Sequence, residues 1–301
     1  MFRRSYHTIV AIFCLMALFG FDYSKHSIPT EQIHDGGPPK DGIPALTDPE
    51  FTSGNDAKYL GPKDRVLGIS INGEAKAYPI NILNWHEVVN DRVGGKDVLV
   101  SYCPLCGTGM VFDAHIKGIR SLFGVSGKLY NSDVLMYDKQ TESLWSQIKM
   151  EAVTGPMTGE KLALLSARHT TWEAWRSQYP DTLILSSKTG YSRDYSRNPY
   201  AGYGQSPEIY FPVDHRDNRL PVKEWVVGVV INGQPKAYSF GRLTKEKAAV
   251  EDVIADKEIT VYFDKNNESA VVKDNNGNVI PSVQAYWFAW KVFYPQTELF
   301  H

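Results

Sequence analysis

Two stretches of the chain share one pattern of apolar and polar positions. Residues 66–78 and 226–238 each contain two apolar runs that flank an Asn-Gly pair, and Gly68 aligns with Gly228 at an offset of 160 residues. An Asn-Gly pair between apolar runs is the strongest short-range signal for a two-residue β-hairpin turn. Each stretch is therefore predicted to form a β-hairpin.

A second repeated pattern follows each hairpin. Residues 172–182 and 287–297 both place tryptophans at helical spacing before a Tyr-Pro pair, and Trp172 aligns with Trp287 at an offset of 115 residues. In the first instance Thr170 precedes Glu173 by three residues, which is the capping-box signature of a helix start. We expect a short helix in both places. The smaller offset predicts an insertion of about 45 residues in the first copy, within residues 120–168.

These patterns predict an α+β protein in which antiparallel β-structure predominates and the helices are short. The fold is expected to be an internal duplication with a long insertion in the first copy. The expected organisation is an extended N-terminal segment (22–65), a first repeat (66–190), a Tyr-rich connection (191–225) and a second, degenerate repeat (226–301). The connection is expected to bridge the copies rather than to act as a lid.

The N-terminus has the pattern of an export signal. Arg3 and Arg4 precede an apolar stretch, Thr8 to Phe21, which is short for a membrane span. Residues 1–21 are predicted to be a signal peptide, with an uncleaved N-terminal anchor as the alternative. The expected location is therefore extracytoplasmic, periplasmic or secreted, with membrane contact only through this segment if it is retained.

Composition excludes some partners. The chain has 301 residues, 43% of them hydrophobic, and a formal net charge of −2, so it can bury a sizeable core and offers no basic surface for nucleic acid. No phosphate-binding loop is present, and no nucleotide or organic cofactor is indicated. The expected partner is a small molecule, a metal ion or another exported protein.

The chemistry is expected at Cys103 and Cys106, which lie in the run Tyr-Cys-Pro-Leu-Cys-Gly at residues 102–107. Such a run is typical of a metal knuckle, a tight turn that presents two thiolates to one ion. One knuckle supplies two ligands, so further ligands must come from elsewhere. A three-ligand site for a soft or borderline ion such as zinc or copper is the leading hypothesis.

Two alternatives stay open. In a thiol oxidoreductase Cys103 would attack, Cys106 would resolve and His86 would transfer protons, but residues 108–112 have the pattern of a strand, whereas that chemistry favours a helix start. In a non-catalytic binding module the cysteines would only brace a turn. Whether the protein is an enzyme is left undecided.

His86 is the predicted third ligand or proton-transfer partner. It lies on the apolar face of a helix expected over residues 79–91, where a histidine is more often a core residue than a ligand. The second copy has Glu246 at the matching position, and the cysteines match Phe263 and Asn266 at the same offset. Because the second copy lacks the reactive set, we interpret the cysteines as an addition to a scaffold that folds without them.

The insertion supplies further candidates. Polar residues in it are expected to line a pocket beside the cysteines: Ser126, Asn131, Asp133, Asp138 and Glu142. His115 and His169 are further ligand candidates, both expected at the surface.

Several ordered motifs resemble a family of bacterial and archaeal proteins, the domain of unknown function 3179 family. The motifs are Asp41-Gly-Ile-Pro44, Ile71-Asn-Gly-Glu-Ala75, Asn84-Trp-His-Glu87, Tyr102-Cys-Pro-Leu-Cys-Gly107, Gly124-Val-Ser-Gly127 and Asn198-Pro-Tyr200. The resemblance covers nearly all of the chain after the leader. It implies an extracytoplasmic protein and carries over no activity, so function has to be argued from the site.

Overall fold

The computed structural model describes residues 20–246 and 249–301. Strands account for 42% of the structure and helices for 11%, and the sheets are mainly antiparallel. The predicted predominance of antiparallel strands with short helices is therefore confirmed. The α+β label is wrong, because the molecule is built of sheets that resemble propeller blades, and its α-helices are only four to seven residues long: α1 (Ile80–His86), α2 (Trp172–Gln178), α3 (Phe240–Leu243) and α4 (Trp287–Phe293).

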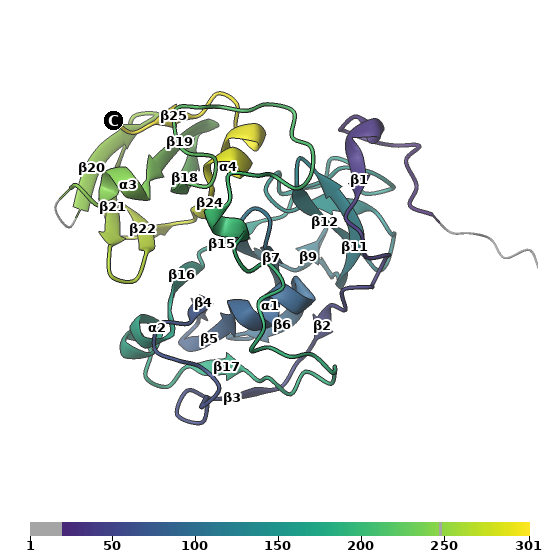
Figure 1. Cartoon of the computed structure of the whole chain (residues 1–301), viewed down its shortest axis with the longest axis horizontal. Coiled ribbons are helices and arrows are strands. Elements are labelled where there is room, and N and C mark those ends of the chain that lie inside the picture. The colour runs from purple at the N-terminus through teal and green to yellow at the C-terminus, as the bar shows by residue number, and fades with distance from the viewer. Residues whose placement is uncertain (1–19, 247–248) are drawn as a thin grey trace, which may run out of the picture.

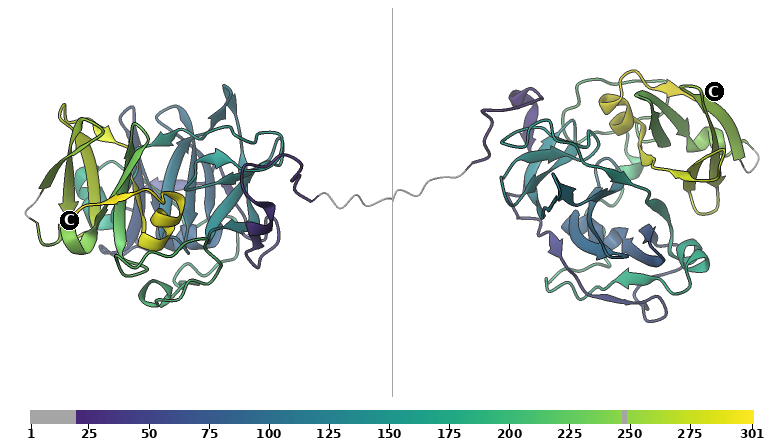
Figure 2. Two further views of the ribbon diagram at one scale, coloured as in Figure 1. Left: turned by 90° about the horizontal axis from the view of Figure 1, so that it is seen from above. Right: turned by 180° about the vertical axis from the view of Figure 1, so that it is seen from behind.

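Five sheets of four or five strands stand around the middle of the molecule and resemble the blades of a five-bladed propeller (Figures 1 and 2). A two-stranded ribbon, β9 (His115–Ile116) with β10 (Ile119–Arg120), accompanies them. None of the helices in the described ranges is long and apolar enough to cross a membrane. The predicted signal peptide lies almost wholly outside the described residues.

The first copy of the predicted repeat contributes two sheets. The first hairpin sheet has the order β16 (Arg168–Thr171), β4 (Arg65–Ile71), β5 (Glu74–Pro79), β17 (Leu183–Leu185), β3 (Phe51–Ser53). The first meander sheet has the order β15 (Leu164–Leu165), β8 (Thr108–Asp113), β7 (Lys96–Cys103), β6 (Val88–Val93), β2 (Leu46–Thr47).

The second copy contributes two sheets of matching topology. The second hairpin sheet has the order β24 (Val283–Tyr286), β18 (Trp225–Ile231), β19 (Gln234–Ser239), β25 (Glu298–Leu299). The second meander sheet has the order β20 (Ala249–Ile254), β21 (Lys257–Asp264), β22 (Ser269–Asp274), β23 (Val279–Ile280). In each hairpin sheet the second hairpin strand has a parallel neighbour: β5 pairs with β17, and β19 pairs with β25.

Side-chain packing also matches between the halves. A Cβ atom on Gly68 would lie 2.4 Å from the ring of Trp175, and one on Gly228 would lie 2.4 Å from the ring of Trp290. Both glycines are in the first strand of a hairpin, and each lets a tryptophan of the following helix lie directly on the sheet. Close packing of this kind leaves no room for a side chain, which explains why both copies have glycine there.

The fifth sheet is the extra material of the first copy. This inserted sheet has the order β1 (Ile33–Asp35), β11 (Phe123–Tyr130), β12 (Asp133–Asp138), β13 (Leu144–Ser146), β14 (Glu151–Ala152). Because β15 already corresponds to β23, the extra residues fall between Asp113 and Leu164. This range begins a few residues before the predicted range of 120–168 and overlaps most of it.

The N-terminal segment is extended and wraps around the molecule. After a short 3-10 helix at Thr30–Gln32 it adds an edge strand to each of three sheets: β1 pairs with β11, β2 with β6, and β3 with β17. These pairings tie the segment to the folded body between Ile33 and Ser53.

Candidate metal centre

The two cysteines lie in the tight turn that joins β7 to β8. Cys103 ends β7, Cys106 follows in the turn, and Thr108 begins β8, so the predicted strand after the cysteines is confirmed. Gly107 has a φ of 63°, and a Cβ atom there would lie 2.6 Å from the ring of Trp225. Only glycine fits this position, because the backbone is left-handed and the ring of a second-half residue covers it.

The turn between β11 and β12 meets the cysteine turn. Asn131 and Ser132 are both left-handed, with φ of 52° and 65°, which gives a two-residue hairpin turn. The carbonyl oxygen of Ser132 lies 3.6 Å from Sγ of Cys103 and 3.5 Å from Sγ of Cys106. Asp133 comes next, as the first residue of β12. The inserted sheet therefore delivers a carboxylate to the cysteines.

Cys103, Cys106 and Asp133 form a compact group of metal-ligating atoms. One ligand atom from each residue lies within 4.8 Å of the other two, all three residues are buried, and the cysteines are free thiols. Asp133 Oδ2 accepts a hydrogen bond of 3.0 Å from the amide of Ile148. Its buried Oδ1 has no hydrogen-bond partner in the described part of the chain. A buried carboxylate oxygen without a donor suits a metal ligand.

The groups of this cluster are all acidic, and burial favours their neutral forms. Burial raises the pKa of the Cys103 thiol and, still further, that of Cys106, whose pKa the neighbouring Cys103 and Asp133 also raise. Burial likewise raises the pKa of Asp133 to about 7 and that of Glu87 to about 8. No ion pair within the described residues involves either carboxylate. In this setting the groups can ionise together only if a cation joins them.

Glu87 reaches the cluster through the backbone at the end of α1. It has a φ of 55°, and its amide still donates a hydrogen bond of 2.8 Å to the carbonyl of Leu83. The left-handed residue ends the helix and leads directly into β6. The carboxyl group of Glu87 interacts with the hydroxyl of Tyr200. Asp133 lies near enough to raise the pKa of Glu87.

His86, the predicted third ligand, lies outside this group. Its Nδ1 is 2.8 Å from the carbonyl oxygen of Pro44, and its Nε2 is 2.6 Å from the hydroxyl of Tyr195. Both ring nitrogens therefore have protein partners, and burial lowers the pKa of the imidazole. The helical spacing correctly predicted that His86 is buried. The third group beside the cysteines is the carboxylate of Asp133, not the imidazole of His86.

Of the other predicted pocket residues, Asn131 lies beside the cluster and three serve the inserted sheet. Asn131 exchanges two hydrogen bonds with Asp214. Ser126 bonds to the carbonyl of Leu135, Asp138 accepts from Thr141 and Trp145, and Glu142 pairs with Lys40.

The two extra histidines differ from one another. His115 is exposed and bonds to Asp113, as expected for a surface residue. His169 is buried, which corrects the predicted surface position. Its Nε2 accepts a hydrogen bond of 2.9 Å from the amide of Gly109, and burial lowers its pKa to about 3. It is therefore a neutral core residue.

The Tyr-rich connection covers the cluster. Its residues contact α1 through Asn84 and Trp85, whose side chains donate to Asn198 and to the carbonyl of Arg197. Tyr203 is buried near both cysteines, and its hydroxyl has no hydrogen-bond partner among the described residues. Composition alone did not reveal these roles. The ordered motifs Asn84-Trp-His-Glu87 and Asn198-Pro-Tyr200 were the available signal for Glu87 and Tyr200.

A cavity of about 240 Å³ adjoins the cluster. Its walls include Leu105 of the cysteine turn, Val134, which follows Asp133, and Glu87, Tyr200 and Phe211. The lining is mainly apolar, and its polar side chains are Glu87, Lys128, Tyr200 and Tyr210. A small molecule in this cavity would lie beside the cysteine turn.

Fold and site together define a β-rich protein of two topologically matching halves, with a buried Cys-Cys-Asp group in the first. Residues 40–297 match a family described as a protein of unknown function (DUF3179), and the chain belongs to this family. The curated proteins contain no match to it. Nor does any solved structure match it.

Proposed function

We propose that this protein binds a soft or borderline transition-metal ion, zinc or copper, through Cys103, Cys106 and Asp133. One observation carries the proposal: the three groups converge in the interior, without a basic partner, and leave Asp133 Oδ1 without a donor in the described part of the chain. Two thiolates and a carboxylate form a donor set that suits zinc, and thiolates also favour copper(I). A bound cation would lower the pKa values that burial has raised.

Three protein ligands would leave a coordination position for a small molecule. Closed structural zinc sites have four protein ligands, whereas sites with three keep a place for water or substrate. The adjoining cavity supplies access for such a molecule, and Glu87 stands at its wall. We therefore favour metal transfer or metal-assisted chemistry over a purely structural ion.

A thiol-disulfide oxidoreductase is the second candidate, supported by the proximity of two free thiols. Its nucleophile should have a lowered pKa, from a helix N-terminus or a nearby cation. Burial instead raises the pKa of Cys103, and the acidic groups Asp133 and Glu87 raise it further. This environment favours the metal-binding proposal.

We further propose an exported protein that arose by internal duplication. The charged start and short apolar stretch of residues 1–21 support export. The matching strand orders of the two hairpin sheets, and the matching strand lengths of the two meanders, support duplication.

The test is metal analysis of protein purified under reducing, metal-replete conditions. We expect stoichiometric metal in the wild type and its loss in Cys103→Ser and Asp133→Asn. Glu142→Gln, an acidic residue on the outside of the inserted sheet, and His86→Ala are the matched controls and should retain metal. Cobalt substitution adds a thiolate charge-transfer band that reports the ligands directly. A wild type without metal, whose cysteines form a disulfide in equilibrium with glutathione, would instead support the oxidoreductase.

A further inference from the structure

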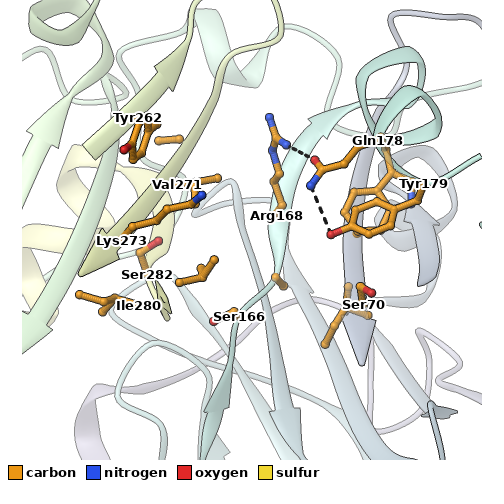
Figure 3. A pocket seen from close by; sticks show the side chains of 16 residues that line it. Ser70, Ser166, Arg168, Gln178, Tyr179, Tyr262, Val271, Lys273, Ile280 and Ser282 are labelled. Carbon is orange, nitrogen blue, oxygen red and sulfur yellow. Dashed lines mark hydrogen bonds between the residues drawn. The ribbon is translucent and has the colours of Figure 1, made fainter. Parts of the chain in front are cut away.

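A second cleft lies between the two halves, away from the cysteines. It has a volume of about 450 Å³ and is walled by the first hairpin sheet and α2 on one side and by the second meander sheet on the other (Figure 3). Ligand pockets for small molecules typically measure about 300–1,000 Å³. The cleft is therefore large enough for a sugar-sized ligand.

The two cations of this cleft replace apolar residues at matching positions of the other half. Lys273 is the fifth residue of β22 and Phe112 the fifth of β8, while Arg168 begins β16 and Val283 begins β24. Their strand partners match too, since Lys273 pairs with Val279 and Phe112 with Leu164.

The apolar counterparts are covered by the inserted sheet. Phe112 and Val283 belong to the same buried cluster as Trp145 and Ile148 of the insertion. Phe293, the counterpart of Gln178 at the end of its helix, packs edge-on against Tyr130 at 5.8 Å. The second half has no inserted sheet among its described residues, so the equivalent place is the open cleft.

The cleft is cationic, although the chain as a whole is slightly acidic. Arg168 and Lys273 line it, and neither Asp nor Glu is among its lining residues. The guanidinium of Arg168 donates only to neutral groups, Ser269 and Gln178, and Lys273 lies 5.4 Å from the ring centre of Tyr262. Neither cation forms an ion pair in the described ranges. Asp264 lies near enough to Arg168 to raise its pKa but forms no ion pair with it, so both cations retain charge that a ligand can neutralise.

We propose that this cleft binds a small organic anion, a carboxylate or phosphate attached to a hydroxylated ring. Arg168 and Lys273 face each other across the opening in Figure 3 and would bind the anionic group from two sides. Ser70, Ser166 and Ser282 offer hydroxyls, and Tyr179 offers a ring face. This second site is independent of the proposed metal centre.

Calorimetric titration at low salt tests the proposal with glucuronate, glucose 6-phosphate and neutral glucose. We expect an anionic probe to bind at least about tenfold more tightly than glucose, and Lys273→Gln to weaken it about tenfold. Glucuronate and glucose 6-phosphate distinguish a carboxylate from a phosphate ligand. Lys265→Gln, an exposed lysine at the turn of the same meander, is the control and should leave binding unchanged.

Arg168→Gln should weaken the same probe, with circular dichroism to verify folding. Binding should also survive in Cys103→Ser, which separates this site from the metal centre. The proposal is overturned if no anionic probe binds in the millimolar range, if glucose binds equally well, or if Lys265→Gln weakens binding as much as Lys273→Gln.

Discussion

The backbone amide of Tyr286 donates a hydrogen bond of 2.9 Å to the carbonyl oxygen of Cys106. Tyr286 ends β24, so a strand of the second half holds the cysteine turn of the first. The reverse contact also exists, because Arg65 of the first half donates to the carbonyl groups of Asn267 and Glu268 in the second meander turn. Each half therefore supports the equivalent turn of the other, and the candidate metal centre depends on their interface.

Because of this interface, we expect Gly107→Ala to lower the free energy of unfolding more than the same substitution at an uncovered left-handed glycine. The substitution places a Cβ in a left-handed backbone and 2.6 Å from the ring of Trp225. The backbone term costs about 1–2 kcal/mol and the overpacking about 1–3 kcal/mol more. We expect a free energy of unfolding lower by about 2–5 kcal/mol, measured by urea denaturation, together with weaker metal binding.

Gly73→Ala is the matched control for this substitution. Gly73 is also left-handed, with a φ of 85°, but nothing lies within 4 Å of the position that a Cβ atom would take there. It should therefore show the backbone term alone. If both variants lost the same free energy of unfolding, the Trp225 ring would move aside at little cost. The second half would then not hold the cysteine turn in place.

Much of the fold was predictable because local rules determine it. The Asn-Gly turns at Asn72 and Asn232 predicted both hairpins, and the tryptophan spacing predicted α2 and α4. The extent of the inserted sheet was less predictable, because its strands pair with an N-terminal strand distant in sequence, as β11 does with β1. Pairing over such a distance leaves no local signal.

The candidate site was predictable only in part. The spacing of Cys103 and Cys106 indicated a metal knuckle, but the third group depended on which neighbour the tertiary fold brings close. His86 and Glu87 are adjacent, and one left-handed residue decides that the carboxylate, not the imidazole, faces the cluster. Asp133 arrives from an insertion whose position relative to the cysteines no spacing rule gives.

The raised pKa of Asp133 predicts a pH dependence of the metal-free protein. Its pKa is about 7 in the folded state, against an ordinary value of 3.8, so the folded state retains a proton that the unfolded state has lost. This contribution therefore makes stability fall as pH rises from about 4 to about 7. Asp133→Asn should flatten that fall, measured by urea unfolding with chelator and reductant present.

Comparison with the wild type is essential for this measurement. Buried His169, with a pKa of about 3, acts in the opposite sense and makes stability rise with pH up to its unfolded pKa near 6.5. Both proteins share that contribution, so the difference between them reports Asp133 together with its effect on the pKa of Glu87. Parallel pH profiles would contradict the buried position of the carboxylate.

His86 is predicted to anchor the Tyr-rich connection rather than to hold metal. Tyr195 bonds to His86 Nε2 at 2.6 Å and to Thr189 at 2.5 Å. Tyr195→Phe removes both bonds and should lower local stability by about 1–2 kcal/mol. We expect faster hydrogen exchange in residues 189–200 with unchanged metal content. Tyr191→Phe, at an exposed tyrosine of the same segment, should change neither property. If Tyr195→Phe lost metal and Tyr191→Phe did not, His86 would contribute to metal binding, contrary to this prediction.

Two buried threonines allow the equivalence of the halves to be tested by comparing losses in the free energy of unfolding. Trp175 Nε1 donates to Thr182 Oγ1 at 2.9 Å, and Trp290 Nε1 donates to Thr297 Oγ1 at 2.8 Å. Replacing either threonine by valine leaves a buried indole N–H without a partner, which costs about 1–3 kcal/mol. We expect similar losses in the free energy of unfolding for Thr182→Val and Thr297→Val, and nearly full recovery with serine, which restores the acceptor. If one valine variant is neutral while the other is strongly destabilised, the matching contacts are not energetically equivalent, and the two halves do not share one packing scheme.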